Sequence, residues 1–288
     1  MEIDATFRCV NMTEYKKLKL GWINGQWGNF KDLKIPINDR GLNFADGIFE
    51  TILILNGIPQ LINEHLDRWK KSANILNMNP PPSKDWLITL IQEGIRLAEL
   101  DKVNGVIRIN WTRGTSEQRG IDINKASRHC FWLEMNSYQP NFKSISTIIS
   151  QTERRNSLSR LSYCKTFSYN QGIQARLEAK NAGFDDALLL NIQGEICCAT
   201  TANIIVKRKN NWLTPPSNSG CLPGIMRQRG IDLNVIKEKF IETTPVDDDE
   251  WFLINSLSCR PIKQINNKKL RLKTNPKDFW LKLLESPE

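Results

Sequence analysis

The chain has 288 residues, of which 40% are hydrophobic and 25% charged, as is typical of a globular protein with one large domain or two modest ones. It contains no apolar run of ~18 residues, so no membrane span is predicted, and its two histidines and seven irregularly spaced cysteines predict neither a metal site nor a disulfide framework. The formal charge of +9 lies in short clusters without a zinc-finger or RNA-binding spacing, so it predicts small anionic ligands rather than nucleic acid.

The first residues, MEIDATFRCVNMTEYKK, carry early acidic side chains and lack an apolar segment. They do not resemble a signal peptide, and we expect a cytoplasmic protein. Two hairpins follow. Asn24-Gly25 and Asn56-Gly57 each lie between apolar segments, and Asn-Gly is the preferred pair for a two-residue hairpin turn.

Helical and strand patterns then alternate through the first half. Apolar side chains recur at helical spacing over residues 64–76, and a second helix is predicted to start after Ser83 as its N-cap. Residues 105–112 instead alternate, with Ile107 and Ile109 on one side and Arg108 on the other, which predicts a half-buried strand.

A polar stretch over residues 136–144 predicts a linker, so we expect an N-terminal α/β domain of residues 1–138 and a C-terminal α/β domain of residues 139–288. The second half contains a helical pattern that ends at Gly183 and several short apolar strands, two of them in the segment 194–216. The mixture predicts an α/β (α+β) fold with predominantly antiparallel strands. No G-x-G-x-x-G follows a strand, which argues against a dinucleotide site.

Lys165 lies in the segment LSYCKTFSYN, which has a strand-like pattern. Its nearest preceding charges are cationic, at Arg160 and at Arg154 and Arg155, and such surroundings favour the neutral amine that Schiff-base chemistry needs. By spacing alone, an exposed lysine at a strand end explains the pattern as well.

Four segments together resemble the class IV (fold-type IV) pyridoxal-phosphate-dependent aminotransferase family. They are NDRGLNFADGIFETI, NEHLDRWKKSANIL, KTFSYNQGIQARLEAKNAGFDDALLLNIQG and LPGIMRQ, in the family's order over roughly residues 35–262. The resemblance implies a two-domain fold with pyridoxal 5′-phosphate in the cleft between the domains, a small anionic amino substrate and a homodimer.

The resemblance also implies roles for particular residues. Lys165 would carry the cofactor as a Schiff base and act as the base, and Arg68 would hold the cofactor phosphate together with Ser256 and the backbone amides at Ile225 and Met226. Tyr169 would contact the cofactor's phenolic oxygen. Arg119 would bind a substrate carboxylate, although a solvated loop arginine explains that position equally well.

Cys198 departs from the family pattern. Relatives carry a glutamate five residues before the asparagine that corresponds to Asn203, and that glutamate pairs with the pyridine nitrogen of the cofactor. A thiol is a weak donor and a poor substitute for a carboxylate. The change should hurt transamination more than an elimination that ends in an aromatic ring.

Three close relatives within the family are candidates for the function of this chain: aminodeoxychorismate lyase, D-amino acid aminotransferase and branched-chain aminotransferase. The segments GIMRQ and EWFLINSL look most like aminodeoxychorismate lyase, which belongs to folate biosynthesis and converts 4-amino-4-deoxychorismate to 4-aminobenzoate and pyruvate. A D-amino acid or branched-chain aminotransferase is the first alternative. The second is a catalytically impaired homologue that binds the cofactor, because Cys198 replaces the glutamate.

Overall fold

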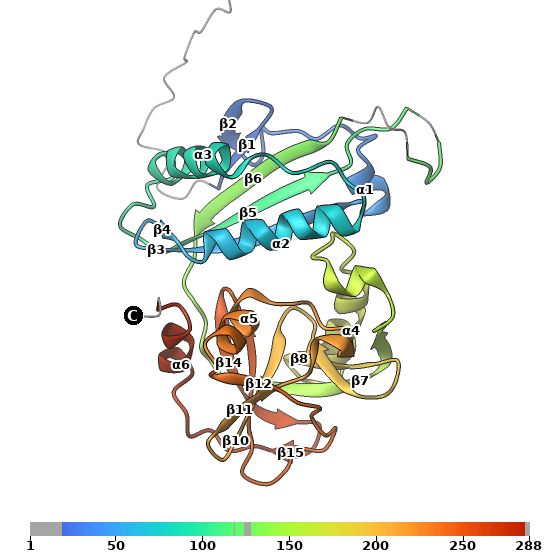
Figure 1. Ribbon diagram of the computed structural model, residues 1–288, viewed down its shortest axis with the longest axis vertical. Helices are drawn as coiled ribbons and strands as arrows, with labels where there is room; N and C mark the ends of the chain where they lie inside the picture. Colours follow the sequence, from blue (N-terminus) through green and yellow to red (C-terminus); the bar gives the residue numbers. More distant parts are fainter. Residues whose placement is uncertain (1–18, 118, 124–127, 286–288) are drawn as a thin grey trace, which may run out of the picture.

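The computed structural model describes residues 19–117, 119–123 and 128–285, and builds them around two sheets stacked along the long axis of the molecule (Figure 1). The strands of the first sheet lie between Leu20 and Ser137, and those of the second between Ile145 and Lys269. The chain therefore passes from one sheet to the other within the polar stretch 138–144.

The first sheet has six strands in the order β2-β1-β6-β5-β3-β4, and every neighbouring pair is antiparallel. Its strands are β1 (Leu20–Ile23), β2 (Gln26–Asn29), β3 (Gly47–Leu55), β4 (Ile58–Pro59), β5 (Gly105–Thr112) and β6 (Cys130–Ser137). Both predicted hairpins are present. Asn24, Gly25, Asn56 and Gly57 all have positive φ, which the paired left-handed turn positions require and which Asn-Gly adopts easily.

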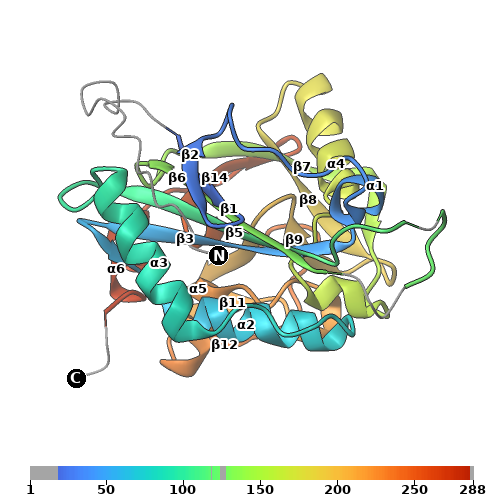
Figure 2. The same ribbon diagram turned by 90° about the horizontal axis from the view of Figure 1, so that it is seen from above.

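Two amphipathic helices, α2 (Ile62–Ile75) and α3 (Lys84–Leu97), cover one face of this sheet (Figure 2). They pack Trp69 and Ile91 against Ile52 and Ile107 of the central strands. Alternation along β3 and β5 therefore turns Phe49, Thr51 and Arg108 toward the second sheet.

The second sheet has nine strands in the order β12-β11-β10-β13-β14-β7-β8-β9, with β15 added to β14. They are β7 (Ile145–Arg155), β8 (Asp186–Asn191), β9 (Ile196–Ala199), β10 (Asn203–Arg208), β11 (Asn211–Thr214), β12 (Ile236–Glu238), β13 (Glu250–Asn255), β14 (Ser258–Ile265) and β15 (Lys268–Lys269). The pairs β7–β8, β7–β14 and β11–β12 are parallel and the remaining pairs antiparallel.

Three helices accompany the second sheet: α4 (Asn170–Asn181), α5 (Ile225–Asp232) and α6 (Pro276–Lys282). Gly183 follows α4 with a left-handed backbone, as the sequence predicts. Leu53 of β3 packs into the core formed by Phe252 on β13 and Trp280 on α6, so an apolar core joins the two parts of the chain.

Two local predictions are wrong. The segment around Lys165 is not a strand, because a 3-10 turn, η2 (Arg160–Tyr163), precedes the lysine and only Thr166 makes an isolated bridge to Ile48. The segment 194–216 forms three strands rather than two, since the chain turns at Thr200–Ala202 between β9 and β10. Within the described residues no helix is both long and apolar enough to cross a membrane.

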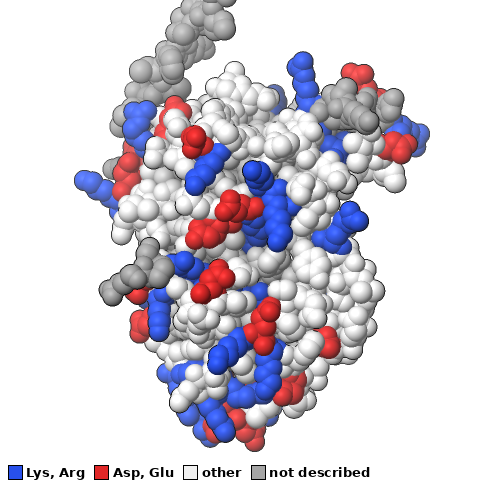
Figure 3. Space-filling view, viewed as in Figure 1, with Lys and Arg blue, Asp and Glu red and all other residues white. Residues whose placement is uncertain are grey.

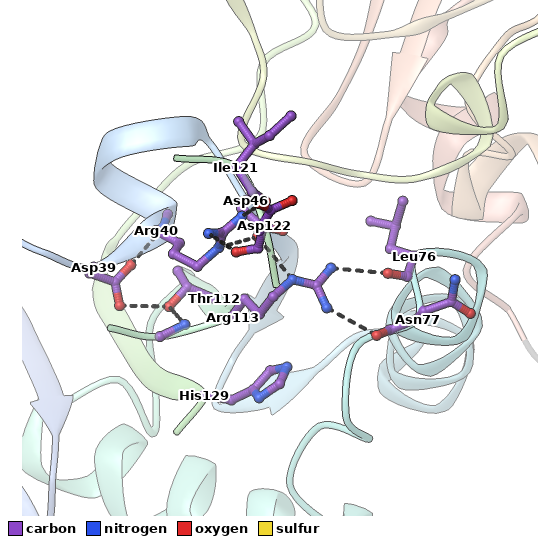
Figure 4. A network of polar contacts seen from close by, with 12 residues as sticks. Asp39, Arg40, Asp46, Leu76, Asn77, Thr112, Arg113, Ile121, Asp122 and His129 are labelled. Carbon is purple, nitrogen blue, oxygen red and sulfur yellow. Dashed lines mark hydrogen bonds and ion pairs between the residues drawn. The ribbon is translucent and has the colours of Figure 1, made fainter. Parts of the chain in front are cut away.

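The short helix α1 (Arg40–Phe44) and the loop after β5 are joined by a polar network (Figure 4). Asp46 accepts hydrogen bonds from Arg40 at 2.8 Å and from Arg113 at 2.9 Å, and both arginines are nearly buried. Arg40 also donates to the carbonyl oxygens of Ile121 and Asp122, and thereby fixes the loop after β5.

The glycine at position 41 belongs to the same network. Asp39 accepts a hydrogen bond from the backbone N–H of Gly41 and another from the hydroxyl of Thr112. A Cβ atom on Gly41 would lie 2.2 Å from Cγ2 of Thr112, so only glycine permits this approach. The motif NDRG thus has a structural cause in the packing of α1 against β5.

Asp46→Asn should lower the free energy of unfolding by about 3–5 kcal/mol, because it leaves two buried guanidinium groups without their shared carboxylate. Chemical denaturation at neutral pH measures this. Asp248→Asn is the matched control: it removes the carboxylate of the exposed pair Asp248–Arg271 and should change stability by about 0–1 kcal/mol. Equal losses in the two variants would contradict the role of Asp46.

Candidate active site

A cavity of about 370 Å³ is lined by residues from both sheets. Six of the eight predicted site residues line it: Arg68, Lys165, Tyr169, Cys198, Ile225 and Ser256. The other two do not. The side chain of Met226 is buried in the core beside Phe252, and Arg119 is exposed on the loop after β5. The roles of these residues, including that of the Met226 backbone amide and of Arg119, stay predictions.

Arg68 reaches the cavity from α2 and is held in a fixed orientation. Its Nε and one terminal nitrogen donate to the two carboxylate oxygens of Glu50 at 2.8 and 2.6 Å, and the other terminal nitrogen donates to the carbonyl oxygen of Pro223 at 3.0 Å. Glu50 is fully buried on β3. A bidentate pair of this kind sets the plane of the guanidinium and leaves further N–H groups for a ligand.

His65 extends this network to the second part of the chain. Its Nδ1 lies 2.7 Å from Glu50 and its Nε2 lies 3.2 Å from the hydroxyl of Ser256. Burial lowers the pKa of His65 and outweighs the opposing effect of Glu50, so the ring is neutral. The neutral tautomer that fits donates from Nδ1 to Glu50 and accepts at Nε2 from Ser256.

Glu50 itself is charged. Burial alone would raise its pKa, but the charge of Arg68 and hydrogen bonds from His65 and Arg68 together lower it from 4.5 to about 2. Sequence reasoning missed both Glu50 and His65, although the spacing of His65 and Arg68 on one helix face was visible. The signal for Glu50 was an acidic residue inside the apolar strand GIFETILIL.

The start of α5 forms the wall next to Arg68. Gly224 is the N-cap residue, and a Cβ atom there would lie 1.9 Å from Oδ1 of Asn203, so a side chain at this position would clash with the Asn203 amide. Ile225, the first residue of the helix, and Ser256 line the same cavity. Free amides at a helix start, a hydroxyl and a fixed arginine together suit a phosphate group.

Lys165 is anchored to the first sheet by its backbone. Its carbonyl oxygen accepts a hydrogen bond from the N–H of Phe49 at 2.9 Å. Its Nζ donates to the hydroxyl of Tyr169 at 3.0 Å and lies 4.4 Å from the centre of the Phe49 ring. The amine therefore projects into the cavity between an aromatic face and a phenol.

Arg108 on β5 is a second cavity residue that sequence reasoning missed. Its guanidinium lies 3.6 Å from the centre of the Phe49 ring and donates to Asn110 at 2.8 Å. Burial lowers its pKa and outweighs Glu134 and Tyr169. Among the described residues it has no ion-pair partner within 4.0 Å. A largely buried guanidinium without a close ion-pair partner is suited to a ligand carboxylate.

The cavity is strongly basic. Arg68, Arg108, Arg155 and Lys165 line it, and no Asp or Glu does so among the residues that the structure describes. The outer surface differs, because blue and red side chains are interspersed on the face shown in Figure 3. Within the described ranges no group of three or more His, Cys, Asp or Glu side chains could hold a metal ion.

Glu50→Gln should remove the counter-charge of Arg68 and destabilise the fold by about 3–5 kcal/mol at neutral pH. Because the folded pKa is lowered, the stabilisation by Glu50 is complete above pH 4.5 and is lost as the pH falls toward about 2. Urea titrations of both proteins between neutral pH and acid measure this. The difference should be constant above pH 4.5 and shrink below it, whereas a difference independent of pH would contradict an ionised Glu50.

Comparisons with known proteins place this geometry in a family. The profile of Amino-transferase class IV matches residues 47–265. A protein of Methanocaldococcus jannaschii named "Putative branched-chain-amino-acid aminotransferase" is 29% identical over 227 residues, which are 77% of this chain and 76% of that protein. Aminodeoxychorismate lyase of Bacillus subtilis is 21% identical over 253 residues, which are 85% of this chain and 86% of the lyase.

A solved structure shows the same fold. The branched-chain aminotransferase of the thermophilic archaeon Thermoproteus uzoniensis, determined with norvaline, superposes with a TM-score of 0.82 at 21% identity and covers 93% of each chain. The predicted α/β fold of fold-type IV is thereby confirmed. Because the profile spans most of the sequence, the chain belongs to the class IV aminotransferase family, whose members depend on pyridoxal phosphate.

Proposed function

We propose that this protein is a pyridoxal-phosphate-dependent lyase that resembles aminodeoxychorismate lyase and acts on an amino substrate with more than one carboxylate. The observation that carries the proposal is the basic cavity, which no Asp or Glu lines among the described residues and in which Arg108 has no ion-pair partner within 4.0 Å after Arg68 is assigned to the cofactor phosphate. The substrate 4-amino-4-deoxychorismate has two carboxylates and yields 4-aminobenzoate and pyruvate, in a reaction of folate biosynthesis.

The residues present fit the cofactor. Arg68, Ser256 and the amide of Ile225 would hold its phosphate. Lys165 would hold its aldehyde carbon through Nζ. Pyridoxal phosphate supplies an aldehyde that bonds to amines and a ring that withdraws electrons from the bound substrate.

Residues of the chain would transfer the proton and orient the substrate. Lys165 Nζ would take the proton from the substrate carbon next to the amine, and Tyr169 keeps Nζ in place by accepting its hydrogen bond at 3.0 Å. Arg108, whose guanidinium lies over the Phe49 ring, would orient a substrate carboxylate. The carboxylate thereby lies within the field of several cations, which favours anionic substrates over neutral ones.

A branched-chain or D-amino acid aminotransferase is the second candidate, and the Methanocaldococcus jannaschii relative favours it. A third candidate binds the cofactor without turnover, and Cys198 in the cavity favours it.

We also propose a homodimer in the cytoplasm. Five exposed apolar side chains gather around α1 and the loop that Arg40 holds: Ile37, Leu42, Phe44, Ile121 and Ile123. A patch of this kind is suited to burial between two copies.

Purified protein should carry pyridoxal phosphate on Lys165 and release pyruvate and 4-aminobenzoate from aminodeoxychorismate. Borohydride reduction with peptide mapping locates the cofactor, and product assays measure the reaction. Lys165→Ala should lose the cofactor bond and nearly all turnover. A cofactor on another lysine would refute the site, whereas new amino acids from amino donors and 2-oxo acids, without pyruvate release, would establish the aminotransferase.

Arg68→Ala should weaken pyridoxal phosphate binding by about 2–5 kcal/mol, because the phosphate loses its partner and Glu50 is left buried without a counter-charge. Equilibrium titration of the apoprotein, followed by absorbance, measures the affinity. Lys70→Ala is the matched control, because Lys70 is exposed on the same helix. Unchanged affinity in Arg68→Ala would show that this arginine serves the fold alone.

A further inference from the structure

The wall of the cavity formed by β7, β8 and β9 carries an unusual pair of side chains. Arg155 is the last residue of β7, and Cys198 lies on β9 opposite Leu189 of β8. Both line the cavity, and Cys198 is nearly buried. The Arg155 guanidinium donates to the carbonyl oxygens of Ser162 at 3.2 Å and Gly220 at 3.4 Å. These neutral acceptors fix its position without balancing its charge.

One carboxylate lies close to this wall, but it is already engaged. Asp186 on β8 accepts hydrogen bonds from Thr200 at 2.6 Å and from the N–H of Ala187 at 2.8 Å through one oxygen, and its other oxygen pairs with Arg176 at 2.7 Å. Asp186 does not line the cavity. Its charge is therefore matched by Arg176 and is not directed at a ligand.

The anchors of the cofactor determine what faces this wall. The phosphate belongs at Arg68 and the start of α5, and the aldehyde carbon belongs at Lys165. The ring nitrogen of pyridoxal phosphate lies across the ring from that carbon, so it points away from Lys165. Arg155 and Cys198 line the cavity from β7 and β9 and belong to neither anchor, and no Asp or Glu of the described chain lines the cavity beside them.

We infer that Arg155 and Cys198 keep the ring nitrogen of the bound cofactor unprotonated. This inference rests on the proposed function, because it assumes that the cavity holds pyridoxal phosphate on Lys165. A pyridine nitrogen stays protonated in a protein when a carboxylate pairs with it, and a nearby cation has the opposite effect. Here the described wall offers a cation and a thiol in place of a carboxylate.

The titratable groups around this wall are Arg155 on β7, Asp186 on β8, Cys197 and Cys198 on β9, and Cys221 before α5. A hydrogen bond from Cys197 and the charge of Arg155 lower the pKa of Cys198, against burial and Asp186. A thiolate at Cys198 would be an anion on the described cavity wall able to stabilise the protonated form of the nitrogen, so the experiment must separate thiol from thiolate.

The consequence concerns the class of reaction. A neutral ring withdraws fewer electrons, so it stabilises negative charge on the substrate carbon less well. Transamination depends on that stabilisation. An elimination that creates an aromatic product depends on it less, because the product supplies driving force. Arg155 and Cys198 thus restrict the proposed enzyme to elimination through the protonation state of the ring nitrogen.

The direct test uses pyridoxal phosphate labelled with ¹⁵N in the ring, bound to the whole protein and observed by NMR from about pH 6 to about pH 9. The ring resonance of the wild type should stay at its unprotonated position. In Cys198→Glu it should move to the protonated position, and the rate of amino transfer from alanine should rise about tenfold for each pKa unit gained. Arg155→Gln should raise the ring-nitrogen pKa.

Cys198→Ser shows whether Cys198 acts as a thiol or as a thiolate, because a serine hydroxyl stays uncharged. If the wild-type nitrogen is unprotonated and stays so in Cys198→Ser, the inference holds. A protonated wild-type nitrogen overturns it, and loss of that proton in Cys198→Ser would identify a thiolate as the cause. Absence of any labelled cofactor on Lys165 would instead refute the proposed function.

Discussion

The fixed orientation of Arg68 by the buried carboxylate of Glu50 is the interaction on which the cavity depends. A carboxylate that is fully buried on β3 is tolerable only because a guanidinium and an imidazole meet both of its oxygens. Arg68 and His65 also connect the two parts of the chain, because Arg68 donates a hydrogen bond to the carbonyl oxygen of Pro223 and Nε2 of His65 accepts one from the hydroxyl of Ser256. The phosphate end of the proposed site is therefore built before any ligand arrives, which lowers the entropy lost on binding.

Side chains along β3 and β5 point alternately to the two faces of the first sheet, and this alternation decides which residues face the helices and which face the cavity. Apolar residues such as Ile52 and Ile107 face the helices, so the opposite face is left for the cavity. Phe49 lies on that face between two cations, with Arg108 at 3.6 Å and Lys165 at 4.4 Å from its ring centre. Its electron-rich faces offset part of the repulsion between them, which allows both cations to point at one small volume.

The sequence predicts local features well, because each depends on near neighbours. The Asn-Gly turns, the alternation over residues 105–112 and the helix with Arg68 follow from turn geometry and periodicity. The family motifs add the positions of Lys165 and the Gly224 turn. Spacing does not reveal the contacts of Glu50, Arg108 and Arg155, because their partners lie on other strands or far along the chain. The segment before Lys165 has a strand-like sequence pattern but forms a 3-10 turn, and the hydrogen bond from Phe49 to the Lys165 carbonyl, which spacing does not reveal, holds the lysine in place.

A crystal structure of the protein with pyridoxal phosphate bound tests the central claim most directly. We expect the phosphate within hydrogen-bond distance of Arg68, Ser256 and the amide of Ile225, with Arg68 still paired to Glu50. We also expect Cys198 and Arg155, without a carboxylate, nearest the ring nitrogen. A phosphate bound elsewhere in the cavity, or an Arg68 that leaves Glu50 to reach it, would contradict the account.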